Sequence, residues 1–231
     1  MNIRERLDIS AYLVIGPENS ARPVEEIVSV AVDEGFTCVQ IRSKVASARE
    51  MISILEKSAA AIHALGKSDS VALLVDDRLD VVLAAREAGI KVDGVHVGQS
   101  DIPVEVCRKF LGEDSIVGLS ARTGDLIDYV KSADVSQIDY FGAGPLHETK
   151  TKLDAGKTAD GRFITHSFEE FSELVKVSPI PVVVGGGVKL KDIPALVATK
   201  VQGFFVVSAV AGADNPRLAA RELVAAWKNN H

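Results

Sequence analysis

The chain alternates between short apolar runs and longer segments in which apolar residues recur every three or four positions. Most of the short runs are continuously apolar and rich in Val and Ile, as expected for parallel strands that are covered on both faces. This pattern predicts eight strands, over Ala11–Gly16, Cys38–Ser43, Val71–Asp77, Gly94–Gly98, Ile116–Ala121, Asp139–Pro145, Pro181–Gly187 and Gly203–Ala209.

The intervening segments have the periodicity of amphipathic helices. Met51 and Leu55 share one face of a predicted helix that ends near Gly66. Pro23 marks an earlier helix start, and Asn215-Pro216 opens the last helix. Eight strand–helix units predict an α/β protein made of one (β/α)8 TIM barrel, a single domain over residues 1–231. An open doubly wound sheet is less favoured, because neither half contains a nucleotide-binding fingerprint.

Composition restricts the class of protein further. A hydrophobic content of 47% allows one large core. The formal charge of −6 and a pI near 5.4 argue against a nucleic-acid partner. No apolar run approaches membrane-spanning length, and Met1–Ser10 is too charged for a signal peptide, so we expect a cytoplasmic protein with no membrane partner. Cys38 and Cys107 are predicted to be reduced core residues.

The second strand delivers cations to one spot. Because side chains alternate along a strand, Gln40, Arg42 and Lys44 fall on the same face. Two cations on one buried face repel each other, so an anionic ligand is the natural explanation. The alternative, in which both cations pair only with neighbouring acids, is less favoured.

Carboxylates follow the third and fourth strands. Asp76 and Asp77 end one strand, and Asp101 follows the next. Carboxylates from adjacent strand ends suit a Mg²⁺ ion that is held partly by substrate oxygens. Zinc is not expected, because the five histidines show no ligand spacing. His96 lies inside the fourth strand, where a core position and a cavity wall are both open.

Two further groups of residues are suited to phosphate. After the sixth strand, Thr149, Thr151 and Lys152 supply two hydroxyls and an ammonium, and Ser120 ends the fifth strand. The glycines 185–187 follow the seventh strand and the Val207–Ser208 pair ends the eighth, where barrels of this class commonly bind phosphate through backbone amides. The sequence thus predicts two anion sites, of which one contains Arg42, Lys44, Lys152 and a metal.

With these residues assembled, the chain resembles the thiamine-phosphate synthase family. The resemblance covers nearly the whole chain and rests on an ordered set of motifs: YLVIG from Tyr12, QIRSK from Gln40, LLVDDRLDVVLA from Leu73, GVHVGQSD from Gly94, IVGLSA from Ile116, GPLHETKTK from Gly144 and VVSA from Val206. Each motif alone is weak, and the ordered set is specific.

The resemblance implies a Mg²⁺-assisted transferase that joins an aminopyrimidine pyrophosphate to a thiazole phosphate, with release of pyrophosphate. Carried over by motif, the pyrimidine pyrophosphate would be held by Gln40, Arg42, Lys44, Asp76, Ser120 and Lys152. Arg42, Lys152 and Ser120 would be catalytic, and Asp77 and Asp101 would hold the metal. The thiazole phosphate would be held by Thr149, Thr151, Gly185, Gly186, Gly187, Val207 and Ser208. The sequence leaves open whether the chain forms a homodimer.

The chain departs from the family pattern at three places. Asp76 stands where the family usually has Asn. Its charge requires one of three things: Asp76 serves as an additional ligand of Mg²⁺, it pairs with a neighbouring cation such as Arg78, or it keeps a proton; the metal is the favoured hypothesis. The family's aromatic-proline pair is replaced by His147-Glu148. The polar segment 153–166 is longer than usual and is interpreted as a flap.

Other functions are weighed against this one. A thiazole tautomerase of the related barrel family would carry a catalytic His shortly after the fifth strand, where this chain has Arg122. A non-catalytic barrel that binds a phosphate ligand would not need Asp77, Asp101 and Lys152 together. A pentose-phosphate epimerase is excluded, because its histidine metal ligands are missing.

Overall fold

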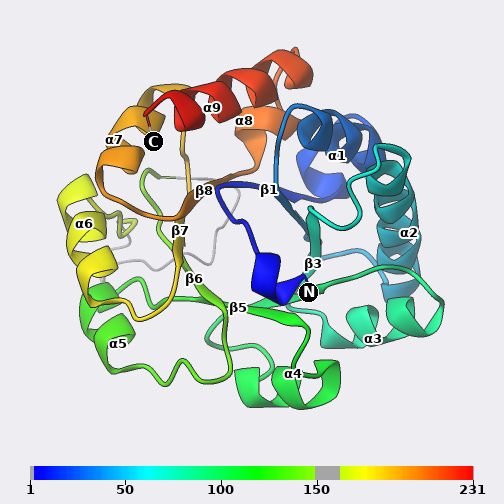
Figure 1. The fold of residues 1–231 in the computed structure, drawn as a ribbon, viewed down its shortest axis with the longest axis horizontal. Helices are drawn as coiled ribbons and strands as arrows, with labels where there is room; N and C mark the ends of the chain where they lie inside the picture. The colour runs from blue at the N-terminus through cyan, green and yellow to red at the C-terminus, as the bar shows by residue number, and fades with distance from the viewer. Residues whose placement is uncertain (1–2, 149–161, 231) are drawn as a thin grey trace.

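The computed structural model describes residues 3–148 and 162–230, which form a closed eight-stranded parallel barrel inside a ring of helices (Figure 1). Each strand pairs with its sequence neighbours, and the eighth closes onto the first. The strands are β1 (Ala11–Ile15), β2 (Cys38–Ile41), β3 (Ala72–Asp76), β4 (Gly94–Val97), β5 (Ile116–Ser120), β6 (Tyr140–Ala143), β7 (Val182–Val184) and β8 (Gly203–Val206). The predicted TIM barrel is confirmed.

Helices cover the outside of the barrel, as the periodicity predicts. They are α1 (Val24–Asp33), α2 (Ala48–Ala64), α3 (Leu79–Glu87), α4 (Val104–Leu111), α5 (Leu126–Ser132), α6 (Phe168–Val177), α7 (Ile193–Ala198), α8 (Ser208–Ala211) and α9 (Pro216–Asn230). Ser47 and Ser167 begin α2 and α6 with reciprocal capping boxes to Glu50 and Glu170. In the described part of the chain, no helix is long and apolar enough to cross a membrane.

The strands have two hydrophobic faces, and the two faces belong to different clusters. Outward residues such as Leu13 and Val39 pack against the helices. Inward residues such as Tyr12, Leu74 and Tyr140 form a smaller cluster inside the barrel. The two cysteines divide between the clusters, both buried as free thiols, which confirms the sequence interpretation. Period-two alternation therefore decides which side chains can reach the interior.

Some strand ends differ from their predicted bounds. Asp77 has a φ of 61°, which ends β3 one residue before the predicted end. β7 stops at Val184, because the glycines that follow leave the extended conformation. β8 stops at Val206, and Ser208 begins the short helix α8 instead of continuing the predicted strand.

A repeated hydrogen bond ties the strands together at the amino-terminal end of the barrel. The residue before each even-numbered strand accepts, with its side chain, a backbone N–H near the start of the preceding odd-numbered strand. The four pairs are Ala11 to Thr37 at 3.4 Å, Leu73 to Asp93 at 2.7 Å, Val117 to Asp139 at 2.7 Å and Val182 to Gln202 at 2.7 Å. These bonds satisfy strand N–H groups that lie at the edge of the core.

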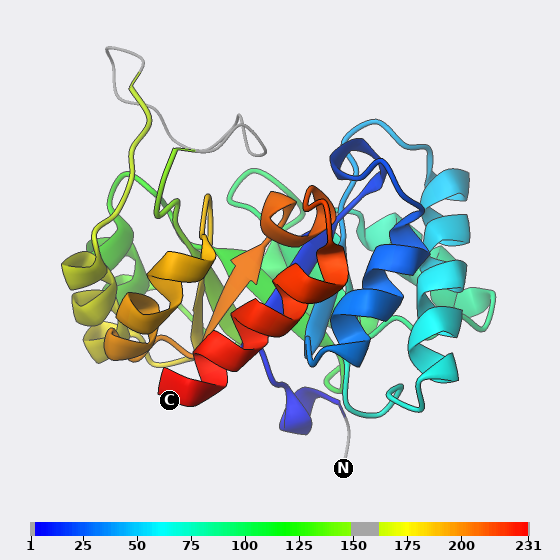
Figure 2. The ribbon, with the colours of Figure 1, turned by 90° about the horizontal axis from the view of Figure 1, so that it is seen from above.

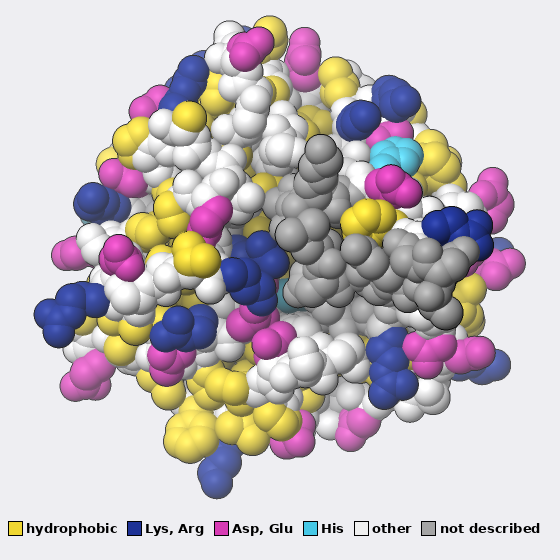
Figure 3. Space-filling model, turned by 180° about the vertical axis from the view of Figure 1, so that it is seen from behind, with side chains coloured by type: hydrophobic (Ala, Val, Ile, Leu, Met, Phe, Trp, Pro, Cys, Tyr) yellow, Lys and Arg dark blue, Asp and Glu magenta, His cyan; other side chains and the backbone are white. Residues whose placement is uncertain are grey.

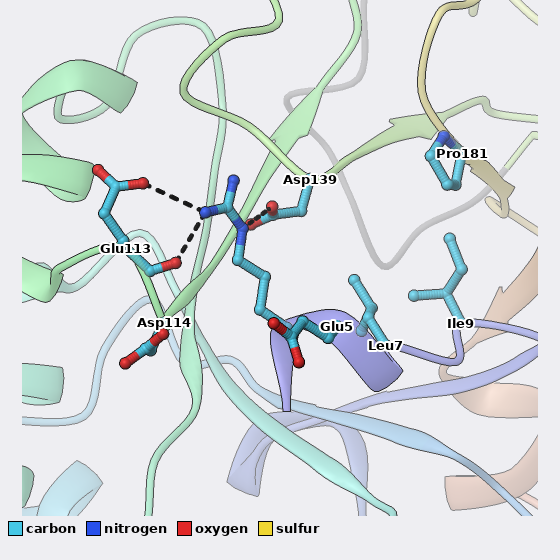
Figure 4. A pocket seen from close by; sticks show the side chains of 8 residues that line it. Glu5, Leu7, Ile9, Glu113, Asp114, Asp139 and Pro181 are labelled. Atoms are coloured by element: carbon cyan, nitrogen blue, oxygen red, sulfur yellow. Dashed lines mark hydrogen bonds and ion pairs between the residues drawn. The ribbon is translucent and has the colours of Figure 1, made fainter. Parts of the chain in front are cut away.

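The amino-terminal segment lies under this end of the barrel (Figure 2). Arg4 donates to Asp139 at 2.5 Å and contacts Glu113, beside a cavity of about 510 Å³ that Leu7, Ile9 and other residues line (Figure 4). The other carboxylate oxygen of Asp139 accepts from the buried Arg108 at 2.9 Å. Asp139 therefore holds two arginines and one strand N–H at once.

We predict that Asp139→Ala lowers the free energy of unfolding by about 3–5 kcal/mol, because it leaves the Arg108 guanidinium, 3% exposed, without its counter-charge. Urea denaturation measures the change. Asp80→Ala is the matched control, since Asp80 pairs with Arg78 at the surface and such pairs contribute about 1 kcal/mol or less. Equal losses in the two variants would contradict the role assigned to Asp139.

Candidate active site

A cavity of about 920 Å³ opens at the carboxyl ends of the strands, opposite the amino-terminal segment. This volume is in the range of small-molecule sites. Figure 3 looks onto this face, where Lys or Arg side chains lie beside Asp or Glu side chains near the centre. Predicted site residues from six strand ends or the loops after them line the cavity: Gln40, Arg42, Lys44, Asp76, Asp77, Asp101, Ser120, Gly185, Gly186, Gly187, Val207 and Ser208.

The cations of the second strand meet the acids of the third. Arg42 Nε lies 3.0 Å from Asp76 Oδ2, and both side chains are largely buried. Lys44 Nζ lies 2.5 Å from Asp77 Oδ2 and is half exposed. Both cations thus have acidic partners, the arrangement that the sequence analysis considered less favoured, and both also line the cavity. Although they are paired, Arg42 and Lys44 still lie at the wall of the cavity, where they could contact an anionic ligand.

Asp76 pairs with a neighbouring cation, but this cation is Arg42 and not Arg78, the example that the sequence offered beside the metal and a retained proton. Arg78 pairs with Asp80 at 2.6 Å. Burial, and then the nearby charge of Asp77, raise the pKa of Asp76 to about 7, although Arg42 and Lys44 act in the opposite direction. Arg42 therefore offsets the charge of Asp76 only in part, and this carboxyl keeps a proton more readily than an ordinary aspartate. The hypothesis that Asp76 binds a metal stays a prediction.

Asp77 and Asp101 lie within hydrogen-bond reach of each other. Burial alone would raise the pKa of Asp77, but hydrogen bonds from Lys44 and the Asp101 carboxyl hold it below its ordinary value. Burial and the contact with Asp77 raise the pKa of Asp101. Asp101 Oδ2 also accepts the N–H of Gly98 at 2.8 Å, which fixes its position.

The contact between the Asp77 and Asp101 carboxyls would suit a divalent cation placed between them. Two carboxylates in contact repel unless a proton or a cation lies between them, and oxygen ligands suit Mg²⁺. Within residues 3–148 and 162–230, no three His, Cys, Asp or Glu side chains are arranged to hold a metal by themselves. A metal at Asp77 and Asp101 would therefore take its remaining ligands from water or from a bound phosphate.

His96 occupies both of the positions that the sequence left open, because it is only 9% exposed and yet lines the cavity. Its Nε2 lies 2.9 Å from Ser120 Oγ, and its Nδ1 lies 2.9 Å from the hydroxyl of Tyr140. Ser120 is thus held at the cavity wall by a buried imidazole. Sequence reasoning missed Tyr12 and Tyr140; the signal was a phenol at inward positions of two apolar strands.

The glycines after β7 line the cavity, and close packing accounts for all three. A Cβ at Gly185 would lie 2.2 Å from the Phe205 ring, one at Gly186 would lie 2.4 Å from Pro145, and one at Gly187 would lie 2.8 Å from His147. Gly186 and Gly187 also have positive φ angles. Their number alone is therefore no argument for phosphate, and their role in binding stays a prediction.

The loop after β6 is held by hydrogen bonds on both sides of residues 149–161, which lie outside the described part of the chain. His147 Nε2 lies 2.9 Å from the buried Asp192 Oδ2, and the backbone N–H of His147 donates to Gly186. On the far side, the N–H of His166 donates to Pro145 O at 2.9 Å. The predicted Thr149, Thr151 and Lys152, and most of the segment expected to be a flap, lie outside the described residues.

Several polar side chains that line the cavity were not singled out as site residues from the sequence, among them Gln99, Arg122 and Lys189. Gln99 Nε2 donates to Ser120 O at 2.7 Å and to the Tyr129 hydroxyl at 2.9 Å. Arg122 stacks over the Tyr129 ring at 4.9 Å and pairs with Asp125. Lys189 follows the glycines. Each follows a predicted strand, so position was the available signal.

Comparison with known proteins gives one consistent result. A family model described as thiamine monophosphate synthase matches residues 11–210. The thiamine-phosphate synthase of Corynebacterium efficiens is 37% identical over 96% of this chain and 96% of its own length, and that of Vibrio parahaemolyticus is 35% identical over 92% and 95%. A solved structure titled thiamine phosphate pyrophosphorylase, from Pyrococcus furiosus, superposes with a TM-score of 0.79 at 29% identity and covers 99% of both chains.

We predict that Asp76→Asn tightens the binding of inorganic pyrophosphate about tenfold, because an incoming anion no longer competes with a carboxylate for Arg42. Calorimetry in the presence of a chelator measures the affinity without metal. Asp125→Asn is the matched control, since its partner Arg122 is 56% exposed and water already screens that pair. Unchanged or weaker binding by Asp76→Asn would show that Asp76 does not restrain Arg42.

Proposed function

Because the chain belongs to the thiamine monophosphate synthase family, and is thus a transferase of thiamine biosynthesis, we propose the following reaction for it. An aminopyrimidine carried on pyrophosphate is joined to a thiazole phosphate, which releases pyrophosphate and leaves thiamine phosphate. The observation that carries this proposal is the convergence of Gln40, Arg42, Lys44, Asp77, Asp101 and Ser120 on one cavity. Cations, a carboxylate pair and neutral donors in one place suit a pyrophosphate ester.

The pyrimidine pyrophosphate is proposed to bind on the side of β2, β3 and β5. Arg42 and Lys44 exchange their carboxylate partners for phosphate oxygens, which a guanidinium can bind with two parallel hydrogen bonds. Lys152 is proposed to join them on the basis of the family motif. Gln40 and Ser120 then contribute neutral hydrogen-bonding groups at the inner wall.

Mg²⁺ is proposed to be held by Asp77 and Asp101 together with phosphate oxygens. When bound there, it would neutralise charge that develops on the leaving pyrophosphate. The chain's own part is to hold the two carboxyls in contact, with Asp101 fixed by Gly98. Lys44 is now paired with Asp77 and would be free to bind the substrate if that carboxylate held a metal.

The thiazole phosphate is proposed to bind across the cavity, at the loops after β6, β7 and β8. Gly185, Gly186 and Gly187 bring the backbone close to the ligand, and Val207 and Ser208 face them from the start of α8. Thr149 and Thr151 are proposed to add hydroxyl donors. This arrangement would place the two substrates side by side in the mouth of the barrel.

Catalysis in this proposal rests on position and charge and requires no side-chain nucleophile. The carbon–oxygen bond to pyrophosphate breaks as Arg42 and Lys152 stabilise the leaving oxygens. The pyrimidine methylene cation that remains is stabilised by its electron-rich ring, and the thiazole nitrogen then attacks it. Holding both substrates in one cavity supplies the advantage of proximity.

The rival functions have less support. A tautomerase would carry its histidine at position 122. This chain has Arg122 there, which stacks on the Tyr129 ring and forms an ion pair with Asp125. A non-catalytic binding barrel would not explain the contact between Asp77 and Asp101. Incubation with both thiamine precursors and Mg²⁺, with detection of thiamine phosphate, tests the proposal directly; its absence at any substrate concentration would refute it.

We predict that Asp101→Ala abolishes turnover that depends on Mg²⁺ and leaves the fold intact, because the carboxylate pair loses one member. Initial rates across a Mg²⁺ titration, with circular dichroism as the check on folding, measure the effect. Asp80→Ala, close after Asp77 but outside the cavity, should retain wild-type rates. Full activity of Asp101→Ala in chelator would rule out the metal assignment.

Lys152→Ala should lower kcat on the order of a hundredfold with little change in KM, because a cation near the leaving oxygen acts mostly on developing charge. Steady-state kinetics with both substrates varied separates the two constants. Lys150→Ala, which removes a lysine of the same segment that is not assigned to the site, is the control and should change kcat by no more than about threefold. A rise in KM alone would show that Lys152 serves binding and not the transition state.

A further inference from the structure

Five polar side chains form one continuous hydrogen-bond chain across the inside of the barrel. Gln40 Nε2 lies 3.0 Å from the Tyr12 hydroxyl, which lies 2.8 Å from the Tyr140 hydroxyl. The chain continues from Tyr140 to His96 Nδ1 and from His96 Nε2 to Ser120 Oγ, each at 2.9 Å. Its two ends, Gln40 and Ser120, are substrate-binding residues in the proposed function, and they lie on β2 and β5.

The middle of this chain is buried. Tyr12 is 2% exposed and Tyr140 is fully buried, and burial raises the pKa of both phenols far above their ordinary value, so each keeps its proton. Tyr140 is absent from the residues that line the cavity. It therefore acts on the site only through its neighbours.

Two glycines make room for the chain. A Cβ at Gly118 would lie 2.3 Å from the Tyr140 ring and 2.5 Å from His96 Nδ1. A Cβ at Gly142 would lie 3.0 Å from the His96 ring. Both glycines have ordinary backbone angles, so they are explained by the space that the imidazole and the phenol occupy.

The polarity of such a chain is set at its ends. A buried phenol has one proton, so one that accepts from one neighbour donates to the other. If Gln40 donates to Tyr12, then Tyr12 donates to Tyr140, and Tyr140 donates to His96 Nδ1. The neutral imidazole then carries its proton on Nε2 and donates to Ser120, so the O–H of Ser120 can donate only to a group other than His96.

We propose that this chain couples the amide of Gln40 to the hydroxyl of Ser120, so that Ser120 is held as a hydrogen-bond donor toward the cavity. Tyr12, Tyr140 and His96 are positioning residues in this arrangement. The ligand of Ser120 in this proposal is a group that only accepts hydrogen bonds, such as a phosphate oxygen. If every hydrogen bond ran in the opposite direction, Ser120 would turn its lone pairs toward that anion. The identity of the ligand rests on the proposed function, whereas the coupling does not.

The test is the position of the His96 proton in the intact protein. At pH 8.5, above the ordinary pKa of an imidazole, ring ¹⁵N shifts distinguish a protonated nitrogen from an unprotonated one. The His96 signals are identified by their loss in His96→Asn. The wild-type protein should carry the proton on Nε2, and a proton on Nδ1 would overturn the proposed polarity whatever any variant does.

Gln40→Glu tests the coupling across the whole chain. An ionised carboxylate only accepts, so Tyr12 must donate to it, and every bond in the chain reverses. The His96 proton should then move from Nε2 to Nδ1, although residue 40 does not contact His96. A His96 proton that stays on Nε2 in the folded variant would refute the coupling.

Two double variants provide the matched controls. Tyr140→Phe removes one hydroxyl from the middle of the chain, so Gln40→Glu in that background should no longer move the proton. Tyr129→Phe removes the hydroxyl of the one tyrosine in the sequence that does not belong to this hydrogen-bond chain, so the proton should still move in that background. Movement in the first background, or its loss in the second, would count against the chain as the route.

Activity gives an independent measurement. Tyr140→Phe alone should lower kcat/KM for thiamine phosphate formation about tenfold, the effect of losing one hydrogen bond that positions a donor (about 1.4 kcal/mol). Wild-type kcat/KM in that variant would show that the coupling has no part in turnover. If the wild-type protein makes no thiamine phosphate, the proposed function fails while the ¹⁵N measurement still decides the coupling.

Discussion

The closed parallel register of the barrel is the constraint on which the rest of the structure depends. Each strand contributes alternate side chains to the interior, so Tyr12, Gln40 and Tyr140 cannot avoid one another once the eighth strand pairs with the first. The same register brings the carboxyl ends of all eight strands to one face. A site made of single residues from distant parts of the sequence follows from this geometry.

Buried or half-buried aspartates lie at both ends of the barrel, but their surroundings differ. At the amino-terminal end, Asp93 and Asp139 accept hydrogen bonds from strand N–H groups and from Lys or Arg side chains, and all of these donors belong to the protein itself. At the carboxyl end, Asp76, Asp77 and Asp101 crowd together and shift one another's pKa. A closed network stabilises the fold, whereas a crowded one is poised to exchange its partners for a ligand.

The pairing with Arg42 and a raised pKa together accommodate a buried carboxyl at position 76, where the resemblance leads us to expect Asn in the family. An uncompensated carboxylate beside a phosphate site would repel the substrate, but Asp76 is bound by Arg42 from the neighbouring strand. His147, another departure, is likewise bound, by the buried Asp192. Both side chains therefore have charged partners within the chain itself.

The sequence by itself determined the barrel, its eight strands and the candidate residues at their ends, because period-two alternation and β–α order are local properties that a closed sheet preserves. It also determined that Arg42, Lys44, Asp77 and Asp101 would share one face. Only the tertiary structure decided which charges pair: Asp76 pairs with Arg42, 34 positions earlier on the neighbouring strand–loop unit, and not with the nearby Arg78, which pairs with Asp80. The packing reason for the three glycines and the buried hydrogen-bond chain from Gln40 to Ser120 were likewise hidden, because each depends on contacts between residues far apart in the sequence.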